Sequence, residues 1–150
     1  MGSKKGVLYI AVGIPGSGKS TYGKNMNNVC VVCPDTIRKE LYGDESIQGD
    51  GREVFSTAYE IAKKHLIEGE NVYFDATNVT KYSRKNTLNQ LSCFAKKCIA
   101  IYFDTPFDEC KRRNAGRSRV VPENVIDSMA QKICKPSKHE GFSEVWNAES

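Results

Sequence analysis

Long hydrophobic runs are missing from this sequence of 150 residues. A membrane-spanning helix needs about 20 consecutive apolar residues, and no stretch of the chain approaches that length. The first apolar run, at 7–12, is short and has no cleavage-like sequence after it, so no secretory signal peptide is recognised. We therefore expect a cytoplasmic protein that has no membrane partner.

Motifs for metal binding and redox chemistry are also scarce. Only Cys30 and Cys33, of six cysteines, have the Cys-x-x-Cys spacing, and the two histidines lie far from them in the sequence. Residues three apart in a strand point to opposite faces, so this pair favours buried strand thiols over a zinc or redox site. His65 falls on the apolar face of an expected helix, and we interpret it as a residue at the edge of the core.

No strong charge imbalance or compositional bias is present. The net charge is +4, 39% of the residues are hydrophobic and 27% are charged, which is typical of a globular domain. The length predicts a single domain over residues 1–150, of which we expect residues 1–5 to be disordered or a cloning remnant. The slight basic excess is compatible with a phosphorylated or nucleic-acid partner without identifying one.

One glycine-rich stretch stands out among the features that are present. Residues 13–20 match the phosphate-binding loop G-x-x-x-x-G-K-[ST], between an apolar run and an expected helix. Glycines let successive backbone N–H groups face an anion. Lys19 supplies a cation for the β- and γ-phosphates of a nucleotide, and Ser20 supplies a hydroxyl for Mg²⁺. The predicted nucleotide-binding residues of this loop are Gly13, Pro15, Gly16, Ser17, Gly18, Lys19, Ser20 and Thr21.

Apolar runs alternate with amphipathic segments along the whole chain. The runs predict strands at 6–12, 29–33, 71–75 and 98–103, with room for a short fifth strand within 141–146. Helical patterns follow at 19–26, 35–41, 52–68 and 81–96, and again from 106 and from 122. This order predicts an α/β P-loop NTPase fold, an open parallel sheet of four to five strands with helices on both faces. The carboxyl ends of such strands meet at one edge, where ligands bind.

Three acids follow expected strands and would share that edge: Asp35, Asp75 and Asp104. Asp35 is a candidate for the acceptor side of a phosphoryl transfer, and it equally fits a helix N-cap. Arg38, three residues on, faces the same side and is either an acceptor contact or a solvated residue. Asp75 closes its strand as a Walker-B acid does, which predicts a Mg²⁺ ligand beside Ser20, with a plain turn residue as the alternative. We interpret Asp104 as a turn or cap residue.

Basic side chains gather in two places. Five cations fall within 111–119, where Gly116 and Pro122 bracket Arg117. That pattern predicts a mobile, arginine-bearing lid over a polyphosphate, with a solvated basic helix as the alternative. A second group comprises Lys81, Arg84 and Lys85. It is either a basic surface that follows a nucleic-acid backbone or an ordinary solvated helix start.

Together these motifs resemble those of the P-loop family of polynucleotide 5′-kinases, and most closely the kinase domains of its bacteriophage members. The matching elements cover essentially the whole chain: the loop at 13–21, Asp35-x-x-Arg38, Asp75-x-Thr77-Asn78 with Arg84 downstream, and Arg113-Asn114 followed by Arg117 and Val121-Pro122. Many kinases share the loop. The combination of Asp35-x-x-Arg38 with the Asp75 loop is far more specific.

The resemblance implies an ATP-dependent kinase, with ATP and Mg²⁺ as cofactors, that phosphorylates 5′-hydroxyl ends of DNA or RNA. By that resemblance Asp35 would be the general base and Arg38 would hold the 3′-phosphate of the acceptor. Asp75 would support the acceptor site, Arg117 would clamp the donor phosphates from the lid, and Arg113 would flank the adenine. The catalytic set is then Lys19, Asp35, Arg38, Asp75 and Arg117. Bacteriophage members also carry a C-terminal phosphatase domain, for which no residues remain, so no 3′-phosphatase is expected.

Two other functions stay open on the sequence. The segment 135–142 resembles a Pro…Glu-Gly-Phe ending found widely in small P-loop ATPases. It weakens the case for a polynucleotide acceptor and admits a kinase for a sugar, nucleoside or antibiotic hydroxyl. A nucleotide-binding regulatory ATPase without an acceptor is the third function. The oligomeric state, the choice between DNA and RNA, and whether the chain is a stand-alone kinase or a fragment of a larger repair protein also stay open.

Overall fold

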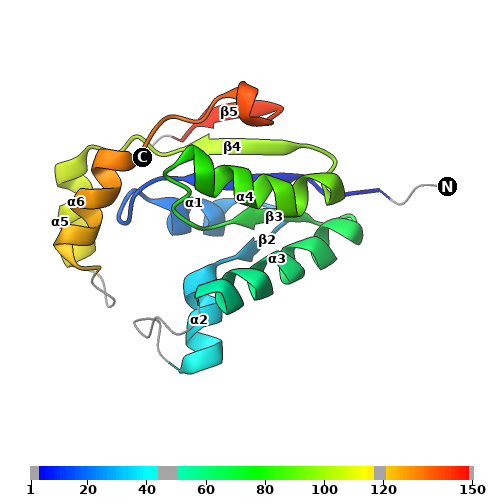
Figure 1. Ribbon diagram of the computed structural model, residues 1–150, viewed down its shortest axis with the longest axis horizontal. Helices are drawn as coiled ribbons and strands as arrows, with labels where there is room; N and C mark the ends of the chain where they lie inside the picture. The colour runs from blue at the N-terminus through cyan, green and yellow to red at the C-terminus, as the bar shows by residue number, and fades with distance from the viewer. Residues whose placement is uncertain (1–3, 44–50, 117–120, 149–150) are drawn as a thin grey trace.

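The computed structural model describes residues 4–43, 51–116 and 121–148 (Figure 1). A five-stranded sheet forms the centre, and all of its strands run parallel in the order β2-β3-β1-β4-β5. The strands are β1 (Leu8–Val12), β2 (Val29–Val32), β3 (Asn71–Phe74), β4 (Cys98–Tyr102) and β5 (Glu144–Asn147). The open parallel α/β sheet predicted from the sequence is therefore confirmed, including its fifth strand.

Helices connect the strands and cover the two faces of the sheet unequally. They are α1 (Lys19–Asn25), α2 (Pro34–Tyr42), α3 (Gly51–Ile67), α4 (Lys81–Leu91), α5 (Phe107–Ala115) and α6 (Glu123–Lys132), with 3₁₀ turns at Ser92–Phe94 and Lys138–Glu140. α3 and α4 lie over one face, α1 lies behind the sheet, and α5 and α6 stand together beyond the carboxyl ends of the strands (Figure 1). In the part of the chain that the structure describes, no helix has the length and apolarity needed to cross a membrane.

Two of the helix boundaries that differ from the sequence-based expectation have local physical reasons. The α-helix expected over 81–96 ends at Leu91, because the next residue, Ser92, is a weaker helix former. A single 3₁₀ turn follows at Ser92–Phe94. α2 begins at Pro34, because proline is well tolerated in the first turn of a helix. Cys33 is consequently the N-cap residue, and Asp35 lies inside the first turn. The interpretation of Asp35 as an N-cap is therefore wrong.

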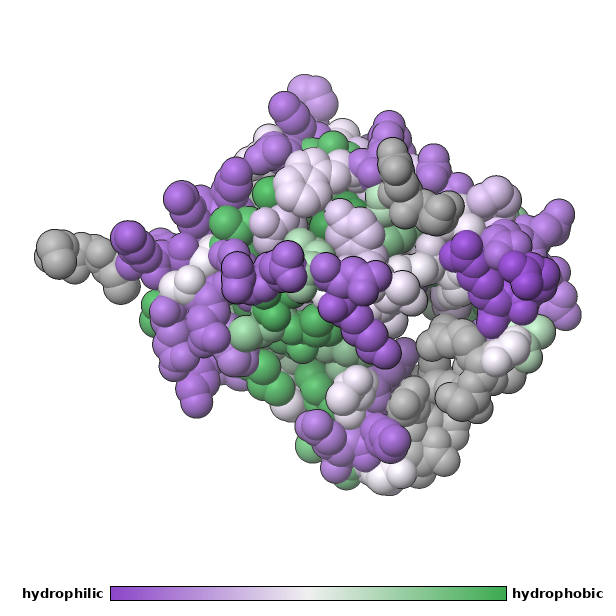
Figure 2. Space-filling model, turned by 180° about the vertical axis from the view of Figure 1, so that it is seen from behind, coloured by the Kyte–Doolittle hydropathy of each residue, from purple (hydrophilic) through white to green (hydrophobic). Residues whose placement is uncertain are grey.

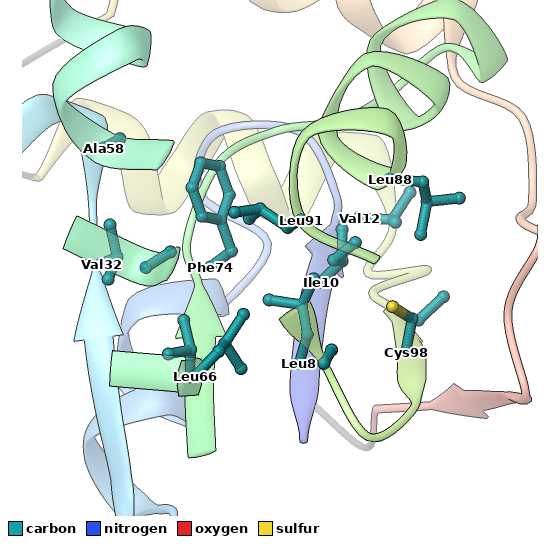
Figure 3. Packing of buried hydrophobic residues seen from close by; sticks show 14 of the residues in the cluster. Leu8, Ile10, Val12, Val32, Ala58, Leu66, Phe74, Leu88, Leu91 and Cys98 are labelled. Atoms are coloured by element: carbon teal, nitrogen blue, oxygen red, sulfur yellow. The ribbon is translucent and has the colours of Figure 1, made fainter. Parts of the chain in front are cut away.

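The main core lies between the sheet and helices α3 and α4. Leu8, Ile10 and Val12 alternate along β1 and point to this face of the sheet (Figure 3). They pack in one cluster with Phe74 of β3 and Leu66 of α3, and all five side chains are fully buried. Burial of each large apolar side chain contributes about 1.5–3 kcal/mol, so this face supplies most of the hydrophobic stabilisation.

The opposite face of the sheet is covered less completely. α1 has only seven residues, so the smaller cluster around Ala11, Ile99 and Ile101 keeps half-buried neighbours. Among them are Tyr9 and Trp146, whose ring centroids lie 5.5 Å apart. Figure 2 shows this side of the molecule, with hydrophobic surface gathered near its centre among hydrophilic side chains. Helices thus lie on both faces of the sheet, as predicted, but they cover only one face completely.

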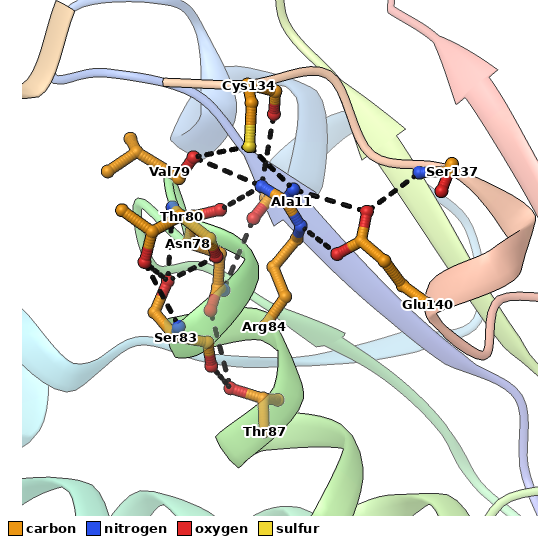
Figure 4. A network of polar contacts seen from close by, with 10 residues as sticks. All are labelled: Ala11, Asn78, Val79, Thr80, Ser83, Arg84, Thr87, Cys134, Ser137 and Glu140. Atoms are coloured by element: carbon orange, nitrogen blue, oxygen red, sulfur yellow. Dashed lines mark hydrogen bonds and ion pairs between the residues drawn. The ribbon is translucent and has the colours of Figure 1, made fainter. Parts of the chain in front are cut away.

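Arg84 on α4 ties the loop after β3 to the C-terminal part of the chain (Figure 4). Its side chain is fully buried, and its guanidinium donates to the two carboxylate oxygens of Glu140 at 2.7 and 3.2 Å. It also donates to three main-chain oxygens, those of Asn78, Val79 and Cys134. Burial by itself would lower the pKa of Arg84, but the hydrogen bonds to Glu140 and Cys134 outweigh it, so the pKa is raised. Arg84 is therefore a buried cation that fixes the loop carrying Asp75.

This burial shows that Arg84 does not belong to a basic surface, and that part of the sequence-based interpretation is wrong. Lys81 and Lys85 are exposed on α4, whereas Arg84 begins the buried stripe that continues at Leu88 and Leu91. Positions three and four apart share one face of a helix, which places a charged residue on the core side. The ion pair with Glu140 offsets the free-energy cost of burying the Arg84 charge at this position.

Replacing Leu66 with Ala is expected to lower the free energy of unfolding by about 2–5 kcal/mol, because it opens a cavity in the main core. The matched variant is Ile67→Ala, whose side chain is 44% exposed on the same helix. It is expected to change the stability by about 0.5 kcal/mol or less. Urea denaturation followed by circular dichroism measures both, and equal losses would contradict the described packing.

Replacing Arg84 with Met is expected to lower the free energy of unfolding by about 3–5 kcal/mol, because it leaves the Glu140 carboxylate without its cation. Lys85→Met, on the exposed side of α4, is the matched control and is expected to be nearly neutral. Adding Glu140→Met to the first variant is expected to restore part of the loss, since no unpaired charge then remains. Chemical denaturation measures all three, and an Arg84→Met chain as stable as wild type would refute the assigned role.

Candidate functional site

Glycine shapes the loop between β1 and α1. Gly16 and Gly18 have φ angles of +85° and +104°, a region that residues with side chains rarely adopt. A Cβ atom on Gly16 would lie 2.3 Å from the carbonyl oxygen of Cys110, so the loop packs directly against α5. The hydroxyl of Thr105, two residues before α5, donates to the carbonyl oxygen of Ser17 at 2.8 Å. The loop thus has a fixed backbone shape of the kind in which N–H groups converge on a phosphate.

Lys19 and Ser20 connect this loop to the end of β3. The Lys19 ammonium is nearly buried and donates to the carbonyl oxygen of Ile14 at 2.9 Å. The Ser20 hydroxyl donates to Asp75 Oδ2 at 2.8 Å. A hydroxyl and a carboxylate are hard oxygen donors of the kind that Mg²⁺ takes. The two residues predicted as metal ligands therefore lie together and have suitable chemistry.

Asp35 and Arg38 lie in the first turns of α2, which follows the carboxyl end of β2. Arg38 Nη1 donates to Asp35 Oδ1 at 2.7 Å. Arg38 is only 9% exposed, and its buried Nε has no hydrogen-bond partner among the described residues. A guanidinium paired with one carboxylate keeps further N–H donors of the kind that suit an anionic ligand. The pair therefore presents a carboxylate and a cation side by side.

A cavity of about 390 Å³ brings most of the predicted catalytic residues together. Its polar lining includes Lys19, Ser20, Asp35, Arg38 and Asp75. Arg117, the remaining predicted catalytic residue, lies outside the described residues, as does the centre of the predicted lid. Asp104 is exposed and is not part of this lining. The carboxyl ends of β2 and β3 and the loop after β1 thus meet at one site, as the fold predicts.

A larger cavity, of about 690 Å³, lies on the other side of the phosphate-binding loop. It is lined by residues 16–21 and by Arg113 of α5. The Arg113 guanidinium approaches Gly18, and its Nε donates to Glu109 Oε1 at 2.9 Å. Hydrogen bonds from Arg112 and Arg113 lower the pKa of Glu109. Of the other predicted loop residues, Pro15 lines the smaller cavity and Gly13 packs against Phe103.

Asn114 is a residue whose part in the site the sequence did not reveal. Its buried side-chain amide donates to the carbonyl oxygen of Val121 at 2.8 Å and accepts from the Val121 N–H at 3.0 Å. These two hydrogen bonds connect the residues on either side of the segment 117–120, which contains Arg117. The sequence contains one indication of this role: Asn114 follows Arg113 in the motif that resembles those of polynucleotide kinases.

The smaller cavity also has an apolar wall. Helical spacing in the sequence, taken alone, would assign the α6 residues of this wall to the core. Val125 and Met129 of α6 are half-buried and line it together with Phe55 of α3. Cys33 lines it as well, where burial and the nearby Asp75 carboxylate raise the pKa of its thiol. The Cys33 side chain is therefore a neutral thiol at neutral pH, and the site has one charged and one apolar side.

Comparisons with known proteins agree with this geometry. The family model described as AAA domain (AAA_33) matches residues 8–136. An L-seryl-tRNA(Sec) kinase of Methanococcus maripaludis is 29% identical over an alignment of 144 residues, which covers 87% of this chain and 53% of that enzyme. The chain thus spans about half the length of this curated relative.

Two solved structures are similar to the whole fold. A chain of the Pnkp1/Rnl/Hen1 RNA repair complex has a TM-score of 0.76 at 23% identity, with 86% of this chain and 44% of that chain covered. A fungal RNA kinase has a TM-score of 0.70 at 16% identity, with 99% and 76% covered. The family match spans well over half of the chain, and the chain has the parallel sheet and the phosphate-binding loop described above. The chain therefore belongs to the AAA domain family AAA_33, as a P-loop domain of the kinase type.

Proposed function

We propose that this chain is an ATP-dependent polynucleotide kinase, which transfers the γ-phosphoryl group of ATP to 5′-hydroxyl ends of DNA or RNA. The observation that carries the proposal is that Asp35 and Arg38 share one cavity with Lys19, Ser20 and Asp75. Asp35, which suits a hydroxyl of the acceptor, and Arg38, which suits a phosphate of the acceptor, therefore lie beside the groups that suit a nucleotide. The RNA repair complex and the fungal RNA kinase support an RNA acceptor, and the seryl-tRNA kinase supports an acceptor that is attached to RNA.

Asp35 and Arg38 are assigned to the acceptor. Phosphoryl transfer passes through a loose transition state, so the Asp35 carboxylate needs only to orient the hydroxyl and take its proton late. The hydrogen bond from Arg38 holds that carboxylate in one orientation. The Arg38 guanidinium, which lines the same cavity, would then contact the phosphate next to the hydroxyl. Phosphate contacts position a nucleic acid without reading its bases, so little sequence preference is expected.

The phosphate-binding loop is assigned to the donor. Lys19 would exchange its contact with the Ile14 carbonyl for the β- and γ-phosphate oxygens. Ser20 and Asp75 would hold Mg²⁺, which when bound neutralises charge on those phosphates. Arg113, beside the loop, is assigned to the adenine side of the nucleotide, and Arg117 is assigned to the donor phosphates.

The shape of the acceptor side favours a polymer. The cavity that contains Asp35 shares Phe55, Ala76 and Thr77 with another cavity, of about 790 Å³, between α3 and α4. Polar side chains such as Asn86 and Gln90 line that cavity. The two cavities adjoin, which would let a chain longer than one nucleotide extend from the first into the second. A small-molecule kinase is the second candidate, because the first cavity alone, at about 390 Å³, has the size of a small-ligand site.

The direct test follows label from γ-labelled ATP to two short oligonucleotides, one with a 5′-hydroxyl and one already 5′-phosphorylated. We expect transfer only to the 5′-hydroxyl strand, and none after EDTA removes Mg²⁺. Asp35→Asn is expected to slow the transfer by about 10²–10⁴-fold, since a general base is lost, with ATP affinity unchanged. Asp104→Asn, which replaces an exposed acid after β4, is the matched control and should keep full activity.

Three outcomes of that test would contradict the proposal. Label on the 5′-phosphorylated strand would mean that the 5′-hydroxyl is not the acceptor. ATP hydrolysis without any transfer, unaffected by Asp35→Asn, would identify a regulatory ATPase. Equal loss of activity in the Asp35 and Asp104 variants would remove the special role assigned to the cavity.

Arg38 distinguishes the two kinase candidates. Arg38→Ala is expected to raise the KM by about 10–150-fold for an acceptor that has a 3′-phosphate, because a charge-assisted hydrogen bond is lost. The KM for an acceptor without phosphate should stay the same. Lys39→Ala, an exposed cation next to it on α2, is the control for a general loss of positive charge. Efficient phosphorylation of a free sugar or nucleoside that Arg38→Ala leaves unchanged would favour the small-molecule kinase.

A further inference from the structure

Three potential metal ligands meet at the amino-terminal edge of the sheet, away from the cavity that contains Asp35. Cys30 lies in β2, His65 lies near the end of α3, and Glu70 immediately precedes β3. Their ligand atoms all lie within 4.8 Å of one another. The Cys30 thiol donates to Glu70 Oε2 at 3.4 Å, and His65 Nδ1 lies 3.1 Å from Glu70 Oε1. Sequence reasoning placed Cys30 and His65 in separate structural roles, and the fold brings them together.

The backbone holds the three side chains in place. Gly69, at a φ of +88°, ends α3, and its N–H donates to the carbonyl oxygen of Leu66 at 3.1 Å. The Glu70 N–H donates to the carbonyl oxygen of His65 at 2.9 Å, which sets Glu70 directly beside the end of the helix. Cys30 is fixed by the parallel pairing of β2 with β3, where it is in register with Val72. Cys30 and His65 therefore lie in regular structure, and Glu70 is held in the short connection between α3 and β3.

We propose that Cys30, His65 and Glu70 form a binding site for a divalent transition-metal ion of the zinc type, with water as the fourth ligand. A thiolate, an imidazole and a carboxylate are the donors that Zn²⁺ takes, whereas Mg²⁺ and Ca²⁺ take oxygen ligands alone. Zinc bonds of 2.0–2.3 Å in a tetrahedron separate neighbouring ligand atoms by about 3.3–3.8 Å. Cys30 Sγ lies 3.4 Å from one carboxylate oxygen of Glu70 and His65 Nδ1 lies 3.1 Å from the other, which is close to that range. The side chain of Glu68, also near the cluster, adds negative charge that favours a cation.

A metal ion at this place would act as a structural clamp. Its ligands come from β2, from α3 and from the residue before β3, so it would join an edge strand of the sheet to the helix that covers it. β2 leads directly into α2, which carries Asp35 and Arg38. The ion would thus stabilise the element that positions the acceptor side. This inference goes beyond the proposed kinase activity and does not depend on it.

The test is a titration of the full chain, freed of metal with a chelator and kept reduced, first with Co²⁺ and then with Zn²⁺. We expect one Co²⁺ per chain with thiolate-to-metal charge-transfer absorption and tetrahedral visible bands, both lost when Zn²⁺ displaces the Co²⁺. Cys30→Ser is expected to abolish the charge-transfer band. His65→Ala and Glu70→Gln should each weaken binding by about tenfold or more. Cys93→Ser, which removes an exposed thiol elsewhere, is the matched control and should bind as wild type does.

Thermal unfolding gives an independent readout. At free Zn²⁺ about 100-fold above its Kd, binding adds about 2.7 kcal/mol to the free energy of unfolding, a rise in Tm of about 5–11 °C for a chain of this length. The rise should be lost in Cys30→Ser and kept in Cys93→Ser. A charge-transfer band that survives Cys30→Ser would assign the metal to another thiol and overturn the proposal. The absence of one-to-one binding in the wild-type chain would overturn it as well.

Discussion

The central strand β1 carries the constraint on which the site depends. It pairs in parallel with β3 on one side and with β4 on the other, and it contributes buried side chains to both faces of the sheet, with only Tyr9 half-buried. A shift by one residue would turn every side chain of the strand to the wrong face, so its register is strongly specified. The loop that follows β1 is consequently held at the level of the residue that follows β3. The 2.8 Å hydrogen bond between Ser20 and Asp75 is a result of that register.

The two sides of the site are stabilised by different means. The loop that carries Asp75 is held by Arg84, a fully buried cation paired with Glu140, which is costly to disturb once formed. The side formed by α5 and α6 rests on a smaller apolar cluster and on the hydrogen bonds between Asn114 and Val121. Groups that must bind and release a ligand are commonly found on elements of lower local stability. In the kinase proposed above, the side fixed by Arg84 would hold Asp75, and the side formed by α5 and α6 would be the one that adjusts to the nucleotide.

Sequence reasoning succeeded where the signal is local. The strands were visible as short apolar runs and the helices as apolar stripes, and their order predicted the parallel sheet. Asp35 and Asp75 were recognised as candidates because each follows a strand. The interpretation of Asp35 as a helix N-cap was wrong, because Pro34 already occupies the first helical position. Arg84 was misplaced because its partner, Glu140, lies 56 residues further along the chain.

The sequence by itself determined the elements, their order and the phosphate-binding loop, because periodicity and a fixed motif spacing are properties of neighbouring residues. Only the tertiary structure decided which distant side chains meet. It placed Asp35 and Asp75 in one cavity, buried Arg84 against Glu140, and brought Cys30 beside His65. These contacts follow from strand order and from the packing of helices on the sheet, which join residues far apart in the chain and leave no mark on the sequence near either partner.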